Sequence, residues 1–329
     1  MEFRKKIDIP VSDLQISHHS KMMLFGSCFI ENIGQKLQEY KFNVNINPFG
    51  ISYNPASISQ SLEILLDKKD FTEKDIFHHG GLYHTFFHHS TFSEEDKDQL
   101  LNKINYHREK ASEDLKNADI FLITFGTSYI YTRKQTNEVI SNCHKLPASY
   151  FGHRRLSVRE IVDSWKCMIL RLREVNPTVK ILFTVSPIRH WKDGAHNNQI
   201  SKSVLLLSID ELSNSSDDIY YFPSYEIVLD ELRDYRFYAE DMIHPNDTAI
   251  RYIWERFSET YFDKETIQIN KQWQNIHKAI SHRPFNEQTK EHKQFLRQTL
   301  LKLNELRNKY PYFECEKERL YLIDKLSQP

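Results

Sequence analysis

Two potential nucleophiles stand side by side in "KMMLFGSCFIENIG" (21–34), where Ser27 and Cys28 follow Gly26 directly. An apolar run precedes the glycine and a helical pattern follows it, so a strand is expected to turn into a helix here. A helix N-terminus offers unpaired N–H groups and partial positive charge, which lower a thiol pKa and stabilise an oxyanion. The junction therefore suits an acyl-transfer nucleophile. A plain helix cap for Ser27 and packing for Cys28 are the alternative interpretations.

A carboxylate and an imidazole stand three residues apart in "YAEDMIHPND" (238–247), as Asp241 and His244. At this spacing the carboxylate can accept a hydrogen bond from the imidazole Nδ1–H. That bond fixes the tautomer and supports the imidazolium that forms when the ring takes a proton. Pro245, directly after the pair, favours a loop that leads into a helix. A helix-entry loop without chemistry is the alternative interpretation.

Other polar side chains follow apolar runs or lie in loops. In "TVSPIRH", Arg189 and His190 come after an expected strand, and Arg189 has the planar guanidinium that binds anionic substrate groups. A structural ion pair is the alternative for Arg189, and the same two interpretations apply to Lys202 in "ISKS". In "NCHKLP", Asn142 and His144 are interpreted as part of a loop that borders a substrate pocket, or as plain structure.

The stretch "FTEKDIFHHGGLYHTFFHHSTF" (71–92) is predicted to form a hairpin that turns at Gly80–Gly81. Its histidines raise the question of a metal site, because imidazole binds zinc and nickel. No carboxylate or thiolate accompanies them at ligand spacing, so no metal and no other cofactor is predicted. Half-exposed hairpin histidines, or a contribution to the substrate pocket, are the remaining interpretations. The histidines are His78, His79, His84, His88 and His89.

Short apolar runs that end at glycine, proline or polar turns predict strands buried on both faces. Helical patterns lie between them, one opening with Asn54–Pro55 and one with the capping-box pair Ser157 and Glu160. This alternation predicts a three-layer α/β/α sandwich with a mostly parallel sheet. Ligands bind beyond the carboxyl ends of such strands, where the nucleophile pair stands. The predicted strands are 21–26, 42–46, 119–126, 180–187 and 218–223.

The character of the sequence changes near residue 263. Residues 1–262 are predicted to form the α/β domain, whereas residues 263–329 are charged, helical in period and without an evident strand. They are interpreted as a C-terminal helical extension that caps the domain. An arm for homo-oligomerisation is the alternative.

The charge balance of the chain argues against whole classes of partner. Its 44 basic and 45 acidic residues give a net charge of −1, which provides no field to gather nucleic acid or an anionic membrane. No apolar run is long enough to span a membrane, and no apolar core follows the basic residues of "MEFRKKIDIP" as in a secretory signal. Four irregularly spaced cysteines predict neither a zinc site nor a disulfide framework, so the cytoplasm is the expected location.

The two chemical motifs, in this order, resemble the SGNH (GDSL-type) hydrolase superfamily, which has Gly-Ser after its first strand and Asp-x-x-His in its last loop. More closely, "GSCFI" resembles the signature of the GSCFA family within it. The resemblance covers about residues 20 to 260. Supporting stretches are "NPFGISYNP", "TFGTSYIY", "NCHKLP", "TVSPIRH", "NQISKSVLL" and "YFPSYEIVLDELRDYRFYAEDMIHP".

The resemblance implies roles for particular residues. Against the superfamily's Gly-Asp-Ser block, alignment on Gly26 makes Cys28 the nucleophile, whereas alignment on the serine favours Ser27. One residue of shift at a helix start turns a side chain by about 100°, so only one of the two can face the histidine well. The spacing favours Cys28, and both residues stay candidates. The last block implies that His244 is the general base and Asp241 its partner.

The implied oxyanion hole departs from the superfamily pattern. Gly50 matches the glycine of the second block, but Gly126-Thr127-Ser128 replaces Gly-x-Asn in the third. Ser128 stands where the asparagine would be, and Thr127 is a second hydroxyl donor there. The missing amide puts the third oxyanion donor in doubt.

The function expected from the resemblance is hydrolysis of an acyl ester, such as an O-acetylated carbohydrate, with acyl transfer as a variant that a thiol nucleophile favours. A non-catalytic carbohydrate- or partner-binding protein that keeps the fold is one alternative. A metal-dependent hydrolase that uses the hairpin histidines is another.

Overall fold

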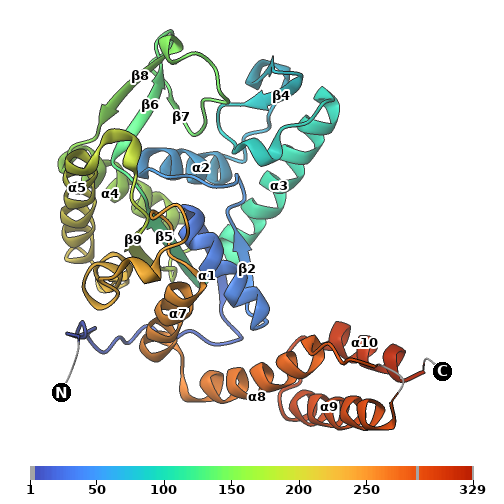
Figure 1. The fold of residues 1–329 in the computed structure, drawn as a ribbon. Helices are drawn as coiled ribbons and strands as arrows, with labels where there is room; N and C mark the ends of the chain where they lie inside the picture. The colour runs from blue at the N-terminus through green and yellow to red at the C-terminus, as the bar shows by residue number, and fades with distance from the viewer. Residues whose placement is uncertain (1–3, 287–288, 328–329) are drawn as a thin grey trace. The chain divides into compact units, whose positions relative to one another are not determined.

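A computed structural model describes residues 4–286 and 289–327 of the chain (Figure 1). Its main sheet consists of β1 (Lys21–Gly26), β2 (Asn43–Ile46), β5 (Ile120–Phe125), β9 (Lys180–Val185) and β10 (Ile219–Phe222), in the order β10-β9-β5-β1-β2. Parallel pairing joins β1 to β5, β5 to β9 and β9 to β10. The strands lie where the apolar runs predict them, and the mostly parallel sheet is confirmed.

Helices cover both faces of this sheet (Figure 1). Met23 and Phe25 of β1 belong to the core that the helices after β2 share, whereas Leu24 points the other way, toward Gly34 of the first helix. All three side chains are buried, as a strand between two helical layers requires. The helices are α1 (Cys28–Glu39), α2 (Pro55–Asp67), α3 (Lys97–Asn117), α4 (Val158–Val175), α5 (Ala195–Ser213), the short α6 (Ser224–Glu226) and α7 (Asp247–Tyr261).

Two helix starts confirm signals that are visible in the sequence. Asn54 Oδ1 accepts a hydrogen bond from Ser57 N–H at 2.8 Å, and Pro55 is the first residue of α2. At α4, Ser157 and Glu160 form both hydrogen bonds of a capping box. These local interactions explain why the helices begin where they do.

Two small antiparallel sheets accompany the main one. The predicted hairpin is confirmed: β3 (Ile76–His79) pairs with β4 (Leu82–Thr85) through a turn at Gly80–Gly81, where both glycines have positive φ. A three-stranded sheet in the order β7-β6-β8 was not predicted. Its strands are β6 (Tyr129–Arg133), β7 (Val139–Ile140) and β8 (Phe151–Arg155).

The chain divides into two compact units. The α/β unit contains Lys21–Gln35 and Val44–Arg256, together with the residues up to Val11. The helical unit contains Ser12–Ser20, Lys36–Asn43 and the chain from Phe257 onward. The boundary predicted from the sequence, after residue 262, stays a prediction.

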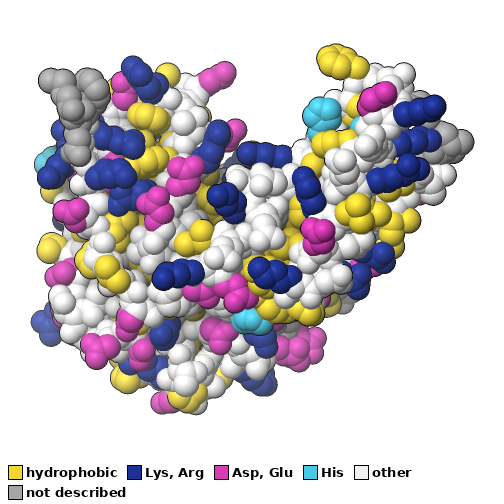
Figure 2. Space-filling view, turned by 90° about the horizontal axis from the view of Figure 1, so that it is seen from below, with side chains coloured by type: hydrophobic (Ala, Val, Ile, Leu, Met, Phe, Trp, Pro, Cys, Tyr) yellow, Lys and Arg dark blue, Asp and Glu magenta, His cyan; other side chains and the backbone are white. Residues whose placement is uncertain are grey.

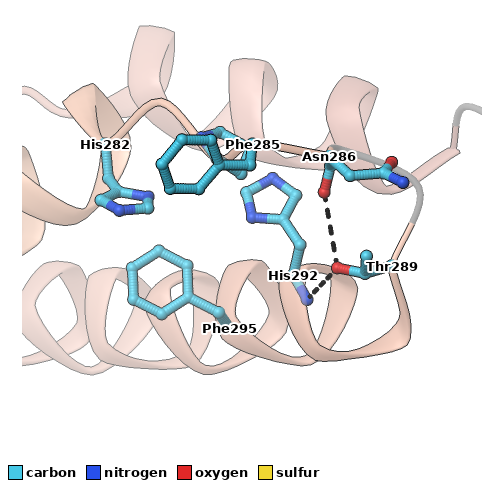
Figure 3. A pocket seen from close by; sticks show the side chains of 7 residues that line it. His282, Phe285, Asn286, Thr289, His292 and Phe295 are labelled. Carbon is cyan, nitrogen blue, oxygen red and sulfur yellow. Dashed lines mark hydrogen bonds between the residues drawn. The ribbon is translucent and has the colours of Figure 1, made fainter.

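Along its described residues, the helical unit continues with α8 (Lys264–Ser281), α9 (Lys290–Lys309) and α10 (Glu316–Ser327). Trp273, Leu303 and Leu322, one from each helix, meet in an apolar core. Where α8 ends and α9 begins, a hollow of about 390 Å³ lies among aromatic and imidazole rings, with Phe285 and Phe295 on its walls (Figure 3). A helical C-terminal extension is thus confirmed, while homo-oligomerisation through it stays a prediction.

The face of the molecule drawn in Figure 2 carries basic and acidic side chains interspersed with uncharged ones. This agrees with the near-equal numbers of the two kinds in the sequence. Among residues 4–286 and 289–327, the helices are all too short or too polar to cross a membrane.

Candidate active site

The strand order of the main sheet identifies where a ligand would bind. Numbered along the chain, the five strands lie in the order 2-1-3-4-5, which is the flavodoxin-like arrangement. The order reverses between β1 and β5, and a crevice forms beyond the carboxyl ends of the strands at such a point. Ser27 and Cys28 follow β1 there, and Gly126 follows β5.

Gly26 turns the chain from β1 into α1. Its φ is +145°, and a Cβ atom at this position would lie 2.4 Å from the carbonyl oxygen of Thr124 on β5. Only glycine allows this approach. The Gly26 N–H donates to Asn47 Oδ1 at 2.8 Å, which fixes the turn.

Ser27 is a buried helix cap. Its side chain is 1% exposed, and its hydroxyl oxygen accepts a hydrogen bond from Phe29 N–H at 3.3 Å. The hydroxyl donates to Ser186 Oγ at 3.1 Å. Both interactions hold the start of α1 in place, which is the usual role of a serine at this position.

Cys28, the first residue of α1, is a partly exposed free thiol. Burial raises the pKa of this thiol, and the negative charge of Glu31 raises it further. The N–H groups of Cys28 and Phe29 and the charge of Lys202 lower it, but do not outweigh the burial. The thiol therefore keeps its proton at neutral pH unless a base takes it.

Asp241 and His244 form the predicted pair. His244 Nδ1 lies 2.5 Å from Asp241 Oδ2, and the N–H groups of Ile243 and His244 donate to Asp241 Oδ1 at 2.9 and 3.0 Å. These backbone hydrogen bonds, followed by that of the imidazole, lower the pKa of Asp241 to about 2. An ionised carboxylate only accepts hydrogen bonds, so Nδ1 carries a proton and Nε2 is left as the basic atom.

The Asp241–His244 loop lies beside the segment that follows β9. The guanidinium of Arg189 donates to the carbonyl oxygen of Met242, and it also lies over the Tyr238 ring, 5.0 Å from its centre. Burial lowers the pKa of His190 to about 4, and the charges of Lys202 and His244 lower it as well. Arg189 therefore helps to hold the Asp241–His244 loop in position.

His190 and Tyr53 meet at the end of β5. Their ring centres are 5.3 Å apart, and a Cβ at Gly126 would lie 3.1 Å from His190 Nε2. Burial raises the pKa of Tyr53, and the charge of Cys28 raises it further, so the phenol and the thiol lie within electrostatic reach. The Tyr53 and His190 rings therefore lie together at this strand end.

The predicted oxyanion-hole residues all have protein partners in this structure. The Gly50 N–H donates to the Asn47 carbonyl oxygen at 2.7 Å. The hydroxyls of Thr127 and Ser128 lie 3.1 and 3.0 Å from Ser201 Oγ, and Ser128 is fully buried. These donors hold the loops after the strands together.

Asn142 and His144 belong to the packing against the hairpin. Asn142 Oδ1 accepts a hydrogen bond from His144 N–H at 2.8 Å, and His144 Nε2 lies 2.8 Å from the Thr85 carbonyl oxygen. Burial lowers the pKa of His144 to about 4, so the ring is neutral and Nε2 is the donor. The His84 ring lies 4.4 Å away.

Lys202 is a buried cation between two strand ends. It is 1% exposed, and its ammonium donates to the carbonyl oxygens of Gly126 and Ser186 at 2.7 and 2.6 Å. These contacts place it against backbone carbonyl groups, in contrast to its predicted role in substrate binding or in a structural ion pair.

Several polar residues of this region escaped the sequence analysis. Tyr53 accepts hydrogen bonds from the N–H groups of Gly126 and Thr127 on its carbonyl oxygen, at 2.8 and 2.9 Å. Ser186 and Ser201 join the loops after β9 and β5 to neighbouring segments. All three stand in stretches that resemble the family signature, but serine and tyrosine have no spacing rule that would single them out.

Within the described part of the chain, His, Cys, Asp and Glu side chains form no group of three or more that is arranged to hold a metal ion. Among the hairpin histidines, His84 has both ring nitrogens in hydrogen-bond contact, with Ser93 Oγ and the His79 carbonyl oxygen.

Solved structures with some likeness to this chain include carbohydrate esterases. A carbohydrate esterase family 3 protein from Talaromyces cellulolyticus is 9% identical with a TM-score of 0.34, covering 77% of this chain and 98% of its own. A family two carbohydrate esterase from Clostridium thermocellum is 13% identical with a TM-score of 0.38, covering 73% and 62%. An acetyl xylan esterase from Butyrivibrio proteoclasticus is 10% identical with a TM-score of 0.37, covering 77% and 64%.

The fold assignment rests on the sheet order and not on these distant likenesses. Comparison with curated proteins finds no match. A model of the GSCFA family matches residues 21–257, and a second, for the C-terminal domain of GSCFA domain proteins, matches residues 273–328. The first match alone covers more than half of the chain, which therefore belongs to the GSCFA family.

Proposed function

We propose that this chain is an acyl-ester hydrolase of the SGNH type, with Cys28 as nucleophile, His244 as general base and Asp241 as the residue that orients the base. The hydrogen-bonded Asp241–His244 pair carries the proposal. A carboxylate that accepts the Nδ1 proton leaves Nε2 ready to take a proton from a nucleophile. The partly buried thiol, whose pKa is raised, needs such a base.

The local geometry favours Cys28 over Ser27 as the nucleophile. The Ser27 hydroxyl is buried and spans Phe29 N–H and Ser186, so attack on a substrate would break the helix cap. Cys28 is partly exposed at the position that alignment on Gly26 assigns to the nucleophile. Ser27 then takes the place of the superfamily's aspartate and acts as a cap.

The reaction proceeds through a thioester. Nε2 of His244 accepts the Cys28 thiol proton while the sulfur attacks the acyl carbon. The C–O bond to the alcohol breaks, and the leaving oxygen takes the proton from His244. Water then attacks the thioester carbon and gives a proton to His244, which returns it to the departing Cys28 sulfur as the carboxylic acid leaves.

The start of α1 is the source of oxyanion stabilisation that this structure supports. The N–H group of Cys28 already lowers the pKa of the thiol, so it also suits a developing negative charge. The hydroxyls of Thr127 and Ser128 are engaged with Ser201. Because one lost oxyanion donor costs about 10²–10³ in rate, we expect slow turnover of simple esters.

A short acyl ester, such as an O-acetylated carbohydrate, is the substrate class that we propose. It follows by analogy from the resemblance to the SGNH superfamily. A thioester also passes its acyl group to alcohols and amines. Acyl transfer to a second substrate is therefore the variant of the same chemistry that the thiol favours.

Hydrolysis of nitrophenyl acetate tests the proposal. We expect Cys28→Ala and His244→Ala to lose at least about 10³-fold in kcat/KM, because each removes a member of a unit that acts together. Cys167→Ser and His78→Ala change exposed residues of the same types and are the matched controls, with wild-type rates expected. Unchanged turnover in His244→Ala would reject the assignment.

A binding protein that keeps the fold is the second candidate. It is favoured by one observation, namely that the Gly50 N–H and the Ser128 hydroxyl already have protein partners. Binding of an acetylated oligosaccharide in calorimetry, with the acetyl groups intact after prolonged incubation, would support this candidate over the hydrolase.

A further inference from the structure

One tryptophan of this chain lies open to water near the carboxyl end of β9. Trp191 is 51% exposed, whereas the other tryptophans, Trp165, Trp254 and Trp273, are at most 7% exposed. Trp191 begins a short helical turn, Trp191–Asp193, in the segment that follows β9. It therefore stands at the edge of the sheet beyond which ligands bind in folds of this strand order.

Two tyrosines join Trp191 in an exposed aromatic cluster. Tyr235 is 62% exposed, and its ring centre lies 5.6 Å from that of Tyr238. The guanidinium carbon of Arg189 lies 5.2 Å from the centre of the Trp191 ring and 5.8 Å from that of Tyr235. It is 5.0 Å from the centre of the Tyr238 ring. The three rings thus gather around one cation, and together they are called the aromatic rim below.

The aromatic rim is attached to the loop that carries the proposed general base. Tyr238 forms an antiparallel bridge with Pro245, the residue after His244. The Ala239 N–H donates to the carbonyl oxygen of His244 at 2.7 Å. The His244 side chain is itself 48% exposed. A substrate with a group on each side of its ester bond can therefore contact the rim and the imidazole together.

The basic side chains near the rim already have partners. The guanidinium of Arg189 faces the rings of the rim. Lys192 donates to the Tyr131 hydroxyl at 2.7 Å, and Arg236 Nε lies 3.2 Å from Asp234 Oδ2. The rim therefore offers flat rings to a ligand more than it offers a charge, which favours an uncharged ligand.

Flat faces with polar edges match the shape and chemistry of a pyranose ring. Indole and phenol rings present an apolar face, and the N–H or O–H group at the edge donates hydrogen bonds. A pyranose has C–H groups on its faces and hydroxyls around its edge. A plain acyl chain has no hydroxyl for those donors and is better suited to an enclosed apolar groove.

We propose that the aromatic rim is a sugar-binding subsite, in which Trp191 and Tyr235 stack on pyranose rings of a carbohydrate ester. The proposal rests on the proposed function in placing the acyl group of that ester at His244. The rim binds the part of the substrate that does not react. It thereby directs the enzyme to esters of oligosaccharides over esters of small alcohols.

The test is calorimetric binding of unacetylated oligosaccharides to the full chain, with xylohexaose, cellohexaose and mannohexaose as probes. We expect Trp191→Ala and Tyr235→Ala each to weaken binding by about tenfold, because each removes a ring from the centre of the contact. Trp191→Phe keeps a flat ring and should retain most of the affinity. Tyr106→Ala changes a tyrosine of α3 that is 63% exposed, and this control should bind as the wild type does.

Two calorimetric results would overturn the proposal. One is unchanged affinity in both Trp191→Ala and Tyr235→Ala, and the other is no binding of any probe at millimolar concentration. Both substitutions change exposed side chains, so we expect both variants to fold. The oligosaccharides contain no ester, so loss of sugar binding and loss of the proposed hydrolase activity are distinguishable.

Tryptophan fluorescence gives a second readout. Because Trp191 is the exposed tryptophan, the sugar should shift the emission of the wild type to shorter wavelength and leave that of Trp191→Phe unchanged. Exposed tryptophan and tyrosine rings also occur where proteins meet a membrane surface, so phosphatidylcholine vesicles are the comparison. An emission shift with vesicles and none with the oligosaccharides would overturn the proposal.

Discussion

The carboxyl edge of the parallel sheet and the core of the helical unit bury different kinds of side chain. At the sheet edge, Ser186, Ser201 and Lys202 are each at most 2% exposed and each has a hydrogen-bond partner. In the helical unit, the interior is formed by apolar side chains such as Trp273 and Leu303. The helical core follows the general preference for apolar burial, whereas the sheet edge departs from it.

The difference lies in what each region requires of its neighbours. A buried hydroxyl or ammonium destabilises a fold unless partners satisfy it, and those partners must come from particular neighbouring loops. At the sheet edge, a hydrogen-bond network meets this requirement, and it ends at Ser27, the residue before Cys28. The helical core is mainly apolar, although the Trp273 indole N–H donates to the Glu39 carbonyl oxygen at 2.7 Å. Its purely apolar side chains can be exchanged for others of similar volume.

The largest effect on stability is expected from Trp273→Ala in the helical unit. Trp273 is 1% exposed, and truncating such a side chain costs about 3–5 kcal/mol. The measurement is hydrogen exchange of amides in α8 to α10. Leu301→Ala, an exposed residue of α9, is the control and should change exchange little. Equal amide exchange rates in Trp273→Ala and Leu301→Ala would contradict this expectation.

A smaller effect is expected from Ser201→Ala at the sheet edge. Ser201 Oγ accepts a hydrogen bond from Ser128 N–H at 2.8 Å, and its loss leaves that buried donor unpaired. We expect a cost of about 1–3 kcal/mol in denaturant unfolding. Thr124→Val is the counterpart, because the buried Thr124 hydroxyl has no hydrogen-bond partner among the described residues. A larger loss in Thr124→Val than in Ser201→Ala would contradict this account.

A graded effect, about 1.4 kcal/mol per pH unit for each histidine, is expected on acidification. In the α/β unit, burial lowers the pKa of His88 to about 3 and the pKa of both His144 and His190 to about 4. In the helical unit, burial lowers the pKa of His18 to about 4. Below pH 6.5 the unfolded chain binds protons that the folded chain does not. This stability is therefore complete above pH 6.5 and decreases as the pH falls toward 4.

Unfolding as a function of pH tests this difference between the units. We expect amides of the α/β unit to lose protection more steeply than those of the helical unit. His88→Phe keeps an aromatic ring stacked on Phe49 but cannot titrate, so its pH slope should be shallower. A slope in His88→Phe as steep as in the wild type would show that another group controls the acid response.

Local signals in the sequence predicted most of the framework. The capping box at Ser157, the Asn54–Pro55 helix start and the Gly80–Gly81 turn act over a few residues, so each is readable without the fold. The three-stranded sheet of β6, β7 and β8 was missed because its strands are only five, two and five residues long. Short strands that pair along their edges show little of the alternating apolar and polar pattern by which a strand is recognised in a sequence.

The site was predictable only in part. Asp241 and His244 are three residues apart, and their hydrogen bond follows from that spacing. The choice between Ser27 and Cys28 depends on one residue of register after Gly26, and no spacing rule in the sequence decides it. The link from Lys202 to Gly126 and Ser186 joins residues 76 and 16 positions apart, so no local pattern announces it.

The most direct test of the central claim is the position of the acyl group on the enzyme. The wild-type chain would be mixed with nitrophenyl acetate, quenched in acid and mapped by mass spectrometry. This account predicts an acetyl group on Cys28, labile to neutral hydroxylamine as a thioester, and none in Cys28→Ala. An acetyl group on Ser27, stable to hydroxylamine, would contradict it.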